Sequence, residues 1–333
     1  MNRLQSLMKR RQRCLSRFFV GFFAIQTARF FAGCLHAPEA PLLEPQEDQH
    51  RPKGHTSGSI RVLQVGQFEA YEAFVHPKGQ WKKIILPIWV GLYEHPKEGL
   101  VLIDSGFPSR TGTAPEDYPG RFQTYTLGLN VSEGESIAER LHELDYSPAD
   151  VKHIIITHMH SDHVGGVEDF PDAAIWVHPD ELYAFDHATS LSGYLPAPLE
   201  HRSLKTFNPS LSAPYGPFEE SYDLFDDGSI RIVSTPGHTA GHLSVLLQGK
   251  GFQTFFLGDV AWIDRHWKEP SRKSTLISVA EEFDWKMNLD ALWRIHHFIN
   301  TTPNLIVISG HEPSAMMNYA PWPAILSPHH LTP

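Results

Sequence analysis

The chain has 333 residues, of which 41% are hydrophobic, so it can bury a substantial core in one large or two modest domains. Its net charge is −10 at pH 7, and an acidic body repels phosphate backbones, which argues against a nucleic-acid substrate. The two cysteines, Cys14 and Cys34, both lie near the N-terminus. The rest of the chain therefore offers only histidine and carboxylate side chains as strong ligands for a metal ion.

The first 38 residues carry seven basic residues and no acidic one, and without those seven charges the net charge of −10 becomes −17. A mostly apolar run follows from Phe18 to Ala28, and small residues precede Cys34. This order is typical of a bacterial export signal with Cys34 as a lipidated residue, although Arg29 interrupts the apolar run and leaves a basic tail as the alternative. We predict the signal or tail over residues 1–35 and a flexible linker over 36–58. An exported chain would be periplasmic or secreted, with membrane attachment through a lipidated N-terminus, and otherwise the chain would be cytoplasmic.

The third predicted segment, residues 59–333, is the main domain, and it opens with extended segments. Strands are predicted over residues 60–65, 83–93 and 100–103, and a helix over 135–144. Pro87 indicates that the second strand is an edge strand or is bent. Asp104 follows the third strand, so it either places a carboxylate at the strand tip or caps a turn.

The stretch from Ile154 to Gly166 carries the strongest signal. A β-branched apolar run predicts a buried strand over residues 151–156, and candidate metal ligands follow it: His158, His160, Asp162 and His163. Because His158 and His160 are two residues apart, their imidazoles emerge on one side of the backbone and can bind one ion. A short loop cannot bring all four groups to one tetrahedral centre, so we expect two neighbouring metal ions. Loop histidines without a role are the alternative in a chain with 21 histidines.

Thr157 to Gly166 resembles the metal motif of the metallo-β-lactamase superfamily of hydrolases, and the resemblance extends from about Ile60 to His311. Residues 68–107 are most similar to the N-acyl homoserine lactonases, on the strings Ile88-Trp89-Val90-Gly91 and Leu102-Ile103-Asp104-Ser105-Gly106. The resemblance implies an α/β fold, a four-layer αβ/βα sandwich in which two mixed β-sheets pack face to face with helices outside. It also implies that Asp104 orients a metal-binding histidine.

Further elements follow the motif. Strands are predicted over residues 173–177, 229–234, 243–247, 252–257 and 305–308, and helices over 179–187 and 279–299. The irregular segment from Ser190 to Glu220 contains five prolines and is interpreted as part of a substrate-pocket wall. His178, His187 and His201 lack a ligand-like spacing, which indicates surface or capping residues.

Three of these strands end in candidate site residues. His238 follows residues 229–234 and can join the first two histidines of the motif, whereas His242 is expected to face the core and support the site. Asp259 follows residues 252–257, and its two oxygens suit a bridge between two cations. His311 follows the last strand and completes the set.

We assign the ligands to two zinc ions, other divalent metals being left open. The first ion takes His158, His160 and His238, the second takes Asp162, His163 and His311, and Asp259 lies between them. Water shared by two such ions loses its proton near neutral pH, and the resulting hydroxide attacks an ester, lactone, thioester or amide carbonyl. Asp162 is the best candidate to pass a proton to the leaving group, so Asp162 and Asp259 are the predicted catalytic residues.

The substrate is indicated by the resemblance. The lactonases carry a tyrosine three residues after the bridging aspartate, where this chain has Trp262. Aromatic residues that line an apolar pocket for an acyl chain, or are ordinary core, are Phe68, Phe107, Trp262 and Trp267. The prediction is a lactonase that opens N-acyl homoserine lactones, the step that degrades quorum-sensing signals, with a homodimer left open. The alternatives are a hydrolase of another ester or thioester such as a hydroxyacylglutathione, a β-lactamase, and a non-enzymatic metal-stabilised binding domain.

Overall fold

A computed structural model describes residues 56–188, 193–195, 199, 203–208, 211–315 and 324–330. All of these residues belong to one unit, which spans Leu43–Pro333. The predicted export signal or basic tail, including Cys34, lies outside the described residues, as does most of the predicted linker. Within the described ranges, no helix combines the length and the apolar character needed to cross a membrane.

The first sheet has seven strands in the order β13-β1-β2-β3-β4-β5-β6. Their bounds are β1 (Ser59–Tyr71), β2 (Lys83–His95), β3 (Gly99–Ile103), β4 (Val151–Ile155), β5 (Ala174–Val177), β6 (Ser203–Thr206) and β13 (Ala324–Ile325). Pairing is antiparallel from β13 to β3 and parallel from β3 to β6. The sheet is therefore mixed.

The second sheet has six strands in the order β12-β11-β10-β9-β8-β7. Their bounds are β7 (Ala213–Tyr215), β8 (Phe218–Asp223), β9 (Ile230–Ser234), β10 (Leu243–Gly249), β11 (Phe252–Gly258) and β12 (Leu305–Ser309). Only the β11–β12 pair among them is parallel, so this sheet is mixed as well.

The two sheets pack face to face through alternating side chains. Phe252 and Phe256 of β11 belong to the core cluster between the sheets, whereas Phe255 and Leu257 belong to the cluster on the other face, against α10 (Trp285–Thr301). This alternation is what a strand buried on both faces requires. At Gly91 of β2 a Cβ atom would lie 2.7 Å from the ring of Phe256, which shows how closely the two sheets approach.

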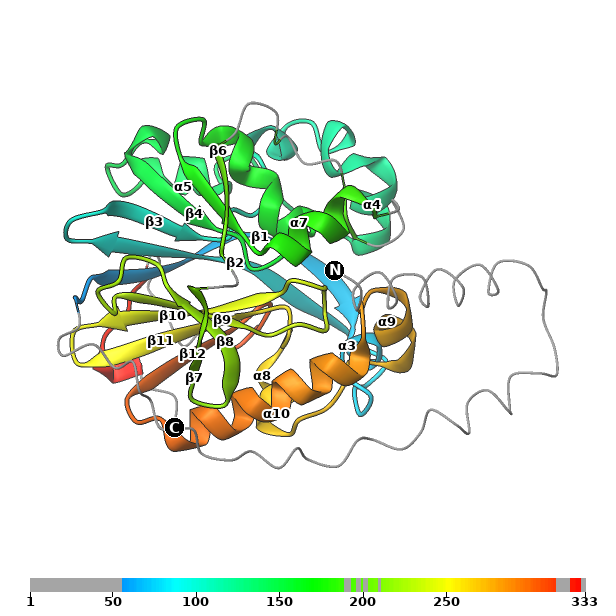
Figure 1. The fold of residues 1–333 in the computed structure, drawn as a ribbon. Coiled ribbons are helices and arrows are strands. Elements are labelled where there is room, and N and C mark those ends of the chain that lie inside the picture. Colours follow the sequence, from blue (N-terminus) through cyan, green and yellow to red (C-terminus); the bar gives the residue numbers. More distant parts are fainter. Residues whose placement is uncertain are drawn as a thin grey trace, which may run out of the picture. The chain divides into compact units, whose positions relative to one another are not determined.

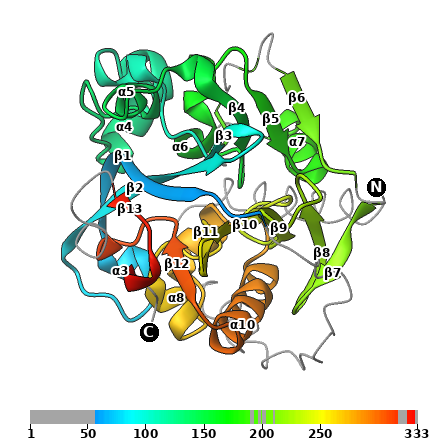
Figure 2. The same ribbon diagram turned by 90° about the vertical axis from the view of Figure 1, so that its left-hand side faces the viewer.

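Helices cover the outer faces, so the molecule has four layers, and the predicted αβ/βα sandwich is confirmed (Figures 1 and 2). On the side of the first sheet are α4 (Arg121–Leu127), α5 (Ile137–His142) and α7 (Pro179–Asp186). On the side of the second are α8 (Asp264–Lys268) and α10, while α3 (Glu72–Val75), α6 (Ser161–Val164) and α9 (Thr275–Ala280) are short connecting helices. Short 3-10 or π turns span Ser109–Gly112, Glu116–Gly120, Pro148–Asp150, Gly165–Asp169 and Pro328–His330.

The helix predicted over residues 279–299 is two helices in the structure, α9 and α10. The Asp284 side chain accepts hydrogen bonds from the backbone N–H groups of Lys286 and Met287 and so caps the start of α10. The apolar spacing continued across this break, but a capping carboxylate starts a new helix because it satisfies N–H groups that have no partner in the helix.

Pro87 lies in the part of β2 that pairs with β1 alone, opposite Gln67, because the pairing of β2 with β3 covers only Gly91 to His95. A proline cannot donate to a ladder, and here, among the described residues, one side of the strand has no paired strand, as at an edge. The whole strand is nevertheless not an edge strand, since β2 lies between β1 and β3 in the sheet order.

The segment from Ser190 to Glu220 is more regular than expected, since it contains β6, β7 and the start of β8. Residues 189–192, 196–198, 200–202 and 209–210, with His201 among them, lie outside the described residues. Tyr194, which is described, is buried and lies against His160, with ring centroids 5.0 Å apart.

Candidate metal centre

The seven predicted ligands follow the ends of four strands that come from both sheets. The motif residues follow β4, and His238, Asp259 and His311 follow β9, β11 and β12. Backbone hydrogen bonds hold these strand ends together, with Leu243 N donating to Thr157 O at 2.9 Å and His311 N donating to Trp262 O at 2.7 Å. The fold thus brings all seven residues together at one place.

The first group consists of His158, His160 and His238. One ligand atom from each lies within 4.8 Å of the others, and all three residues are buried. His238 Nε2 is 3.1 Å from His160 Nδ1, so these two nitrogens face one point. This is the trio that the sequence assigned to the first ion.

The second group consists of Asp162, His163 and His311, whose ligand atoms also lie within 4.8 Å of one another. Asp162 Oδ2 is 3.5 Å from His163 Nε2 and 3.7 Å from His311 Nε2. The Asp162 side chain is 19% exposed, so solvent reaches this side of the centre.

Asp259 lies between the two groups, and its Oδ2 reaches both, since it is also 3.3 Å from His311 Nε2. Its Oδ2 is 3.5 Å from His238 Nε2 and 3.9 Å from His158 Nε2. Its Oδ1 is 3.3 Å from His163 Nε2 and 3.1 Å from His311 Nε2. A carboxylate placed in this way can hold two cations at once.

Several of these residues have buried nitrogen or oxygen atoms that lack a hydrogen-bond partner and could bind divalent cations. His158 Nε2, His163 Nε2 and Asp259 Oδ1 are buried without a hydrogen-bond partner, and each such atom costs about 1–3 kcal/mol unless something binds it. Imidazole nitrogen and carboxylate oxygen are ligands that zinc accepts, which makes a bound cation the simplest way to satisfy them.

The charges of the centre agree with this fit. Burial, with help from the neighbouring His163, holds the pKa of His158 well below its ordinary value, so the ring is neutral as a metal ligand must be. Burial also lowers the pKa of His163, but Asp162, Asp104 and Asp259 outweigh it and the net pKa is well above the ordinary value. These three carboxylates thus favour a positive charge at His163, which is the charge that a bound cation would supply.

Asp104 makes the contact that the orienting role implied by the resemblance requires. Its Oδ2 accepts a hydrogen bond from His163 Nδ1 at 2.8 Å, which turns His163 Nε2 toward the centre. Its Oδ1 accepts from Thr157 N at 2.8 Å, which ties the end of β3 to the residues that follow β4. The backbone of Asp104 has φ 62°, a left-handed conformation that aspartate tolerates better than most residues.

His242 faces the core. Its Nε2 accepts hydrogen bonds from the N–H groups of Asp259 and Val260 at 3.0 and 3.2 Å, and burial lowers its pKa to about 3. At Gly258, with φ 61°, a Cβ atom would lie 2.8 Å from this nitrogen. His242 therefore fixes the turn that carries Asp259.

Glu181, on α7, supports the centre, a role that was not predicted from the sequence. It is fully buried, and its two oxygens accept from Met159 N at 2.8 Å and Gly241 N at 3.0 Å. Met159 lies between two ligands and Gly241 lies near a third, so one carboxylate ties both loops together. Tyr194 also donates to it, at 2.9 Å.

Lys273 is a second residue that sequence reasoning missed. It is 1% exposed, and its Nζ lies 2.8 Å from Asp259 O, 3.1 Å from Glu282 Oε1 and 3.4 Å from His238 Nδ1. A lysine in a segment with several charged neighbours gives no signal of burial, so the sequence could not have revealed this contact.

The four predicted pocket residues lie in different surroundings. Phe68 packs edge-on against His311 and Trp262, with ring centroids 4.9 and 6.4 Å apart, and the Trp262 indole donates to Asp259 Oδ2 at 2.6 Å. Phe107 is buried against Tyr118, and Trp267 belongs to the core cluster beside α10. Phe68 and Trp262 are thus the two that border the metal-binding residues.

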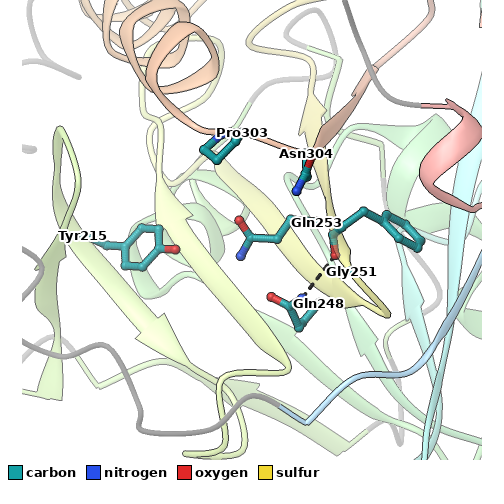
Figure 3. Close-up of a pocket in the computed structure, with 7 residues that line it drawn as sticks. Tyr215, Gln248, Gly251, Gln253, Pro303 and Asn304 are labelled. Carbon is teal, nitrogen blue, oxygen red and sulfur yellow. Dashed lines mark hydrogen bonds between the residues drawn. The ribbon is translucent and has the colours of Figure 1, made fainter.

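An open hollow of about 350 Å³ lies at another part of the molecule (Figure 3). Its lining residues are Tyr215, Gln248, Gly251, Phe252, Gln253, Pro303 and Asn304. Gln253 lies near the start of β11, whereas Asp259 follows the end of that strand. The hollow is therefore separate from the candidate metal centre.

Comparisons with known proteins agree with this geometry. Residues 85–311 match the family model described as the metallo-beta-lactamase superfamily. The N-acyl homoserine lactonase AttM of Rhizobium radiobacter is 28% identical over 238 residues, which is 70% of this chain and 85% of that protein. A probable metallo-hydrolase of Mycobacterium tuberculosis is 27% identical over 231 residues, which is 65% of this chain and 72% of that protein.

The solved structure of an N-acyl homoserine lactone hydrolase with the product N-hexanoyl-L-homoserine bound at its catalytic metal centre has a TM-score of 0.66. It is 21% identical, and the match covers 81% of this chain and all of that one. The dizinc quorum-quenching lactonase AidC, with a bound product, has a TM-score of 0.53 at 17% identity, covering 80% of this chain and 88% of that one. These likenesses show the fold.

The αβ/βα sandwich with histidines and aspartates gathered at its strand ends defines a metal-dependent hydrolase, and that prediction is confirmed. The family match covers more than half of the sequence. The chain belongs to the metallo-beta-lactamase superfamily.

Proposed function

We propose that the chain is a two-metal lactonase that opens the ring of N-acyl homoserine lactones and so degrades quorum-sensing signals. The observation that carries the proposal is Asp259, whose carboxylate lies between two groups of candidate ligands, within 3.5 Å of His238 on one side and 3.1 Å of His311 on the other. The lactonase names of the relatives support the choice of substrate class. Zinc is the proposed metal, because the ligands are nitrogen and oxygen atoms in two small groups.

The residues have distinct roles in this proposal. His158, His160 and His238 hold one ion, and Asp162, His163 and His311 hold the other, with Asp259 shared. When bound, the two ions lower the pKa of water to near neutral and polarise the lactone carbonyl. Asp162, which is partly exposed beside the second group, is placed to carry a proton to the alkoxide that leaves when the ring C–O bond breaks.

Phe68 and Trp262 offer an apolar border beside His311 for an acyl chain. The indole N–H of Trp262 is already donated to Asp259 Oδ2, so Trp262 does not supply the substrate contact that tyrosine makes in related lactonases. Another group, or the ions alone, must polarise the substrate oxygen.

The test is to incubate the zinc-loaded full chain with acyl homoserine lactones of several chain lengths, a glutathione thioester and a cephalosporin. We expect ring opening of the lactones, followed as acid release, and we expect Asp259→Ala to lose zinc and activity together. Cleavage of only the thioester or the cephalosporin would favour those alternative substrates. No hydrolysis by protein with full zinc content would favour a binding domain.

We also propose export through residues 1–35, with Cys34 as the lipidated residue. The basis is the order of basic, apolar and small residues in the sequence. Cell fractionation and the mass of the mature protein test this, and an unprocessed chain in the cytoplasm would contradict it.

A further inference from the structure

The two candidate ion sites differ in what lies behind their ligands. A metal-binding histidine uses one ring nitrogen for the ion and carries a proton on the other, here called the outer nitrogen. An acceptor beside that proton makes the ring a better ligand, whereas a donor there makes it a poorer one. The hydrogen-bond partners of the outer nitrogens therefore affect how tightly each site holds its ion.

Both histidines of the Asp162 group have acceptors. His163 Nδ1 donates to the carboxylate of Asp104 at 2.8 Å, and His311 Nδ1 donates to the carbonyl oxygen of Pro87 at 2.9 Å. The oxygen of Asp259 that faces this group, Oδ1, has no hydrogen-bond partner and keeps its lone pairs for a cation. This site is built from electron-rich ligands.

The His238 group is surrounded differently. The ammonium of Lys273 lies 3.4 Å from His238 Nδ1, and an ammonium has no lone pair to accept the proton that His238 must carry there when Nε2 binds an ion. The oxygen of Asp259 nearest His238, Oδ2, already accepts the indole N–H of Trp262 at 2.6 Å and also lies 3.3 Å from His311 Nε2. The outer nitrogen of His158 lies 3.1 Å from the Thr157 hydroxyl, which itself donates to Asp104.

Lys273 cannot move away from this position cheaply. It is 1% exposed, and Glu282, also buried, pairs with it at 3.1 Å while the oxygen of Asp259's backbone accepts a second N–H at 2.8 Å. Asn288, from the first turn of α10, donates to the same Glu282 oxygen at 3.1 Å. The positive charge is therefore held against His238 by a buried network.

We propose that Lys273 and Trp262 are positioning residues that make the two ion sites unequal, so that the Asp162/His163/His311 site holds its ion more tightly than the His158/His160/His238 site. The inference rests on the proposed two-ion centre. The more weakly held ion receives less electron density from its ligands, so it is the stronger Lewis acid toward a substrate carbonyl. It is also the first to leave when zinc is scarce.

The test is a Zn²⁺ titration of the chelator-treated full chain against a competing chromophoric chelator, which needs no substrate. We expect two dissociation constants at least tenfold apart. His238→Gln removes the weaker one and His311→Gln removes the tighter one. Trp262→Phe and the double variant Lys273→Met with Glu282→Gln should each tighten the weaker constant on the order of tenfold and leave the tighter one unchanged.

A matched control separates this role from general packing. Trp267→Phe removes an indole N–H that points to Asp264 and should leave the weaker constant unchanged. Equal constants, a tighter site that depends on His238, or the same change in Trp267→Phe as in Trp262→Phe would overturn the inference. A chain that binds no cation would instead contradict the proposed two-ion centre.

Discussion

Glu181 shows what a single buried side chain contributes to this centre. Its two oxygens hold the N–H groups of Met159 and Gly241, and these residues belong to loops that follow β4 and β9 in different sheets. Burial raises the pKa of its carboxyl above the ordinary value, and the hydrogen bonds from these loops oppose that rise. The fold thus accepts the cost of a buried carboxylate where it fixes the distance between ligands from the two sheets.

Glu181→Gln is expected to loosen both loops. The amide keeps one acceptor but turns an NH₂ group toward an N–H that it cannot satisfy, so unfolding free energy should fall by about 1–3 kcal/mol. Zinc affinity should fall about 10–100-fold. Urea unfolding and retained zinc after dialysis measure the two effects. Asp186→Asn, on the exposed side of the same helix, is the control, and equal zinc retention in both variants would contradict the role of Glu181.

His242 should make the stability of the chelator-treated protein depend on pH. Its folded pKa of about 3 lies below the ordinary 6.5, so between these values the unfolded chain binds a proton that the folded chain does not. Stability therefore falls as pH is lowered through this range, by up to about 1.4 kcal/mol per pH unit for this one group. His242→Gln should show a shallower decline between pH 7 and pH 5 in urea unfolding. Parallel declines would show that other groups account for the dependence.

The candidate ligands could be predicted at the residue scale because they lie within a few residues of the ends of apolar strands, as Asp259 follows Gly258. The supporting residues could not. Glu181 occupies a helix position where glutamate is ordinarily exposed, and Lys273 lies in a segment with Glu269 and Arg272 that is typical of a surface loop. Their roles depend on three-dimensional contacts with residues more than ten positions away, which no local pattern contains.

At the scale of elements, the connection between α9 and α10 positions His238. Backbone N–H groups of Phe283 and Asp284 donate to the carbonyl oxygens of His238 and Gly237 at 2.8 and 2.9 Å. At Gly237, with φ 141°, a Cβ atom would lie 2.1 Å from the backbone nitrogen of Asn288. The apolar periodicity did not reveal the break between α9 and α10. The residues at this break are the ones that contact the loop carrying His238.

Asp284→Ala should destabilise the protein by about 1 kcal/mol, because the first turn of α10 loses its cap. Zinc content should stay unchanged, since the backbone contacts of residue 284 remain. Thermal or urea unfolding measures the loss. Asp290→Ala on the same helix removes only a partly exposed pair with Arg294 and should cost less. An equal cost for both variants would argue against the cap.

At the scale of the whole molecule, the four layers were predicted from the resemblance to the metallo-β-lactamase superfamily and not from the periodicity of apolar residues. Strand patterns do not state that β1 pairs with β13 or that β11 pairs with β12, which are separated by hundreds or tens of residues. The strands with long apolar runs were predicted, whereas β6, β7, β8 and β13 were not. Their arrangement depends on burial of both faces of each sheet, a property of the assembled molecule.

Both core clusters are built from apolar side chains between the sheets and beneath α10, and the metal ligands lie at the strand ends. Removal of the metal should therefore leave the fold intact while it abolishes hydrolysis. Each zinc ion at 1,000 times its dissociation constant adds about 4 kcal/mol, so the removal of each should lower the melting temperature by roughly 10 °C for a domain of this size. Circular dichroism at 25 °C should not change, and added zinc should restore both melting temperature and activity. A chain that unfolds at 25 °C on chelation would point instead to a domain that uses metal for its structure.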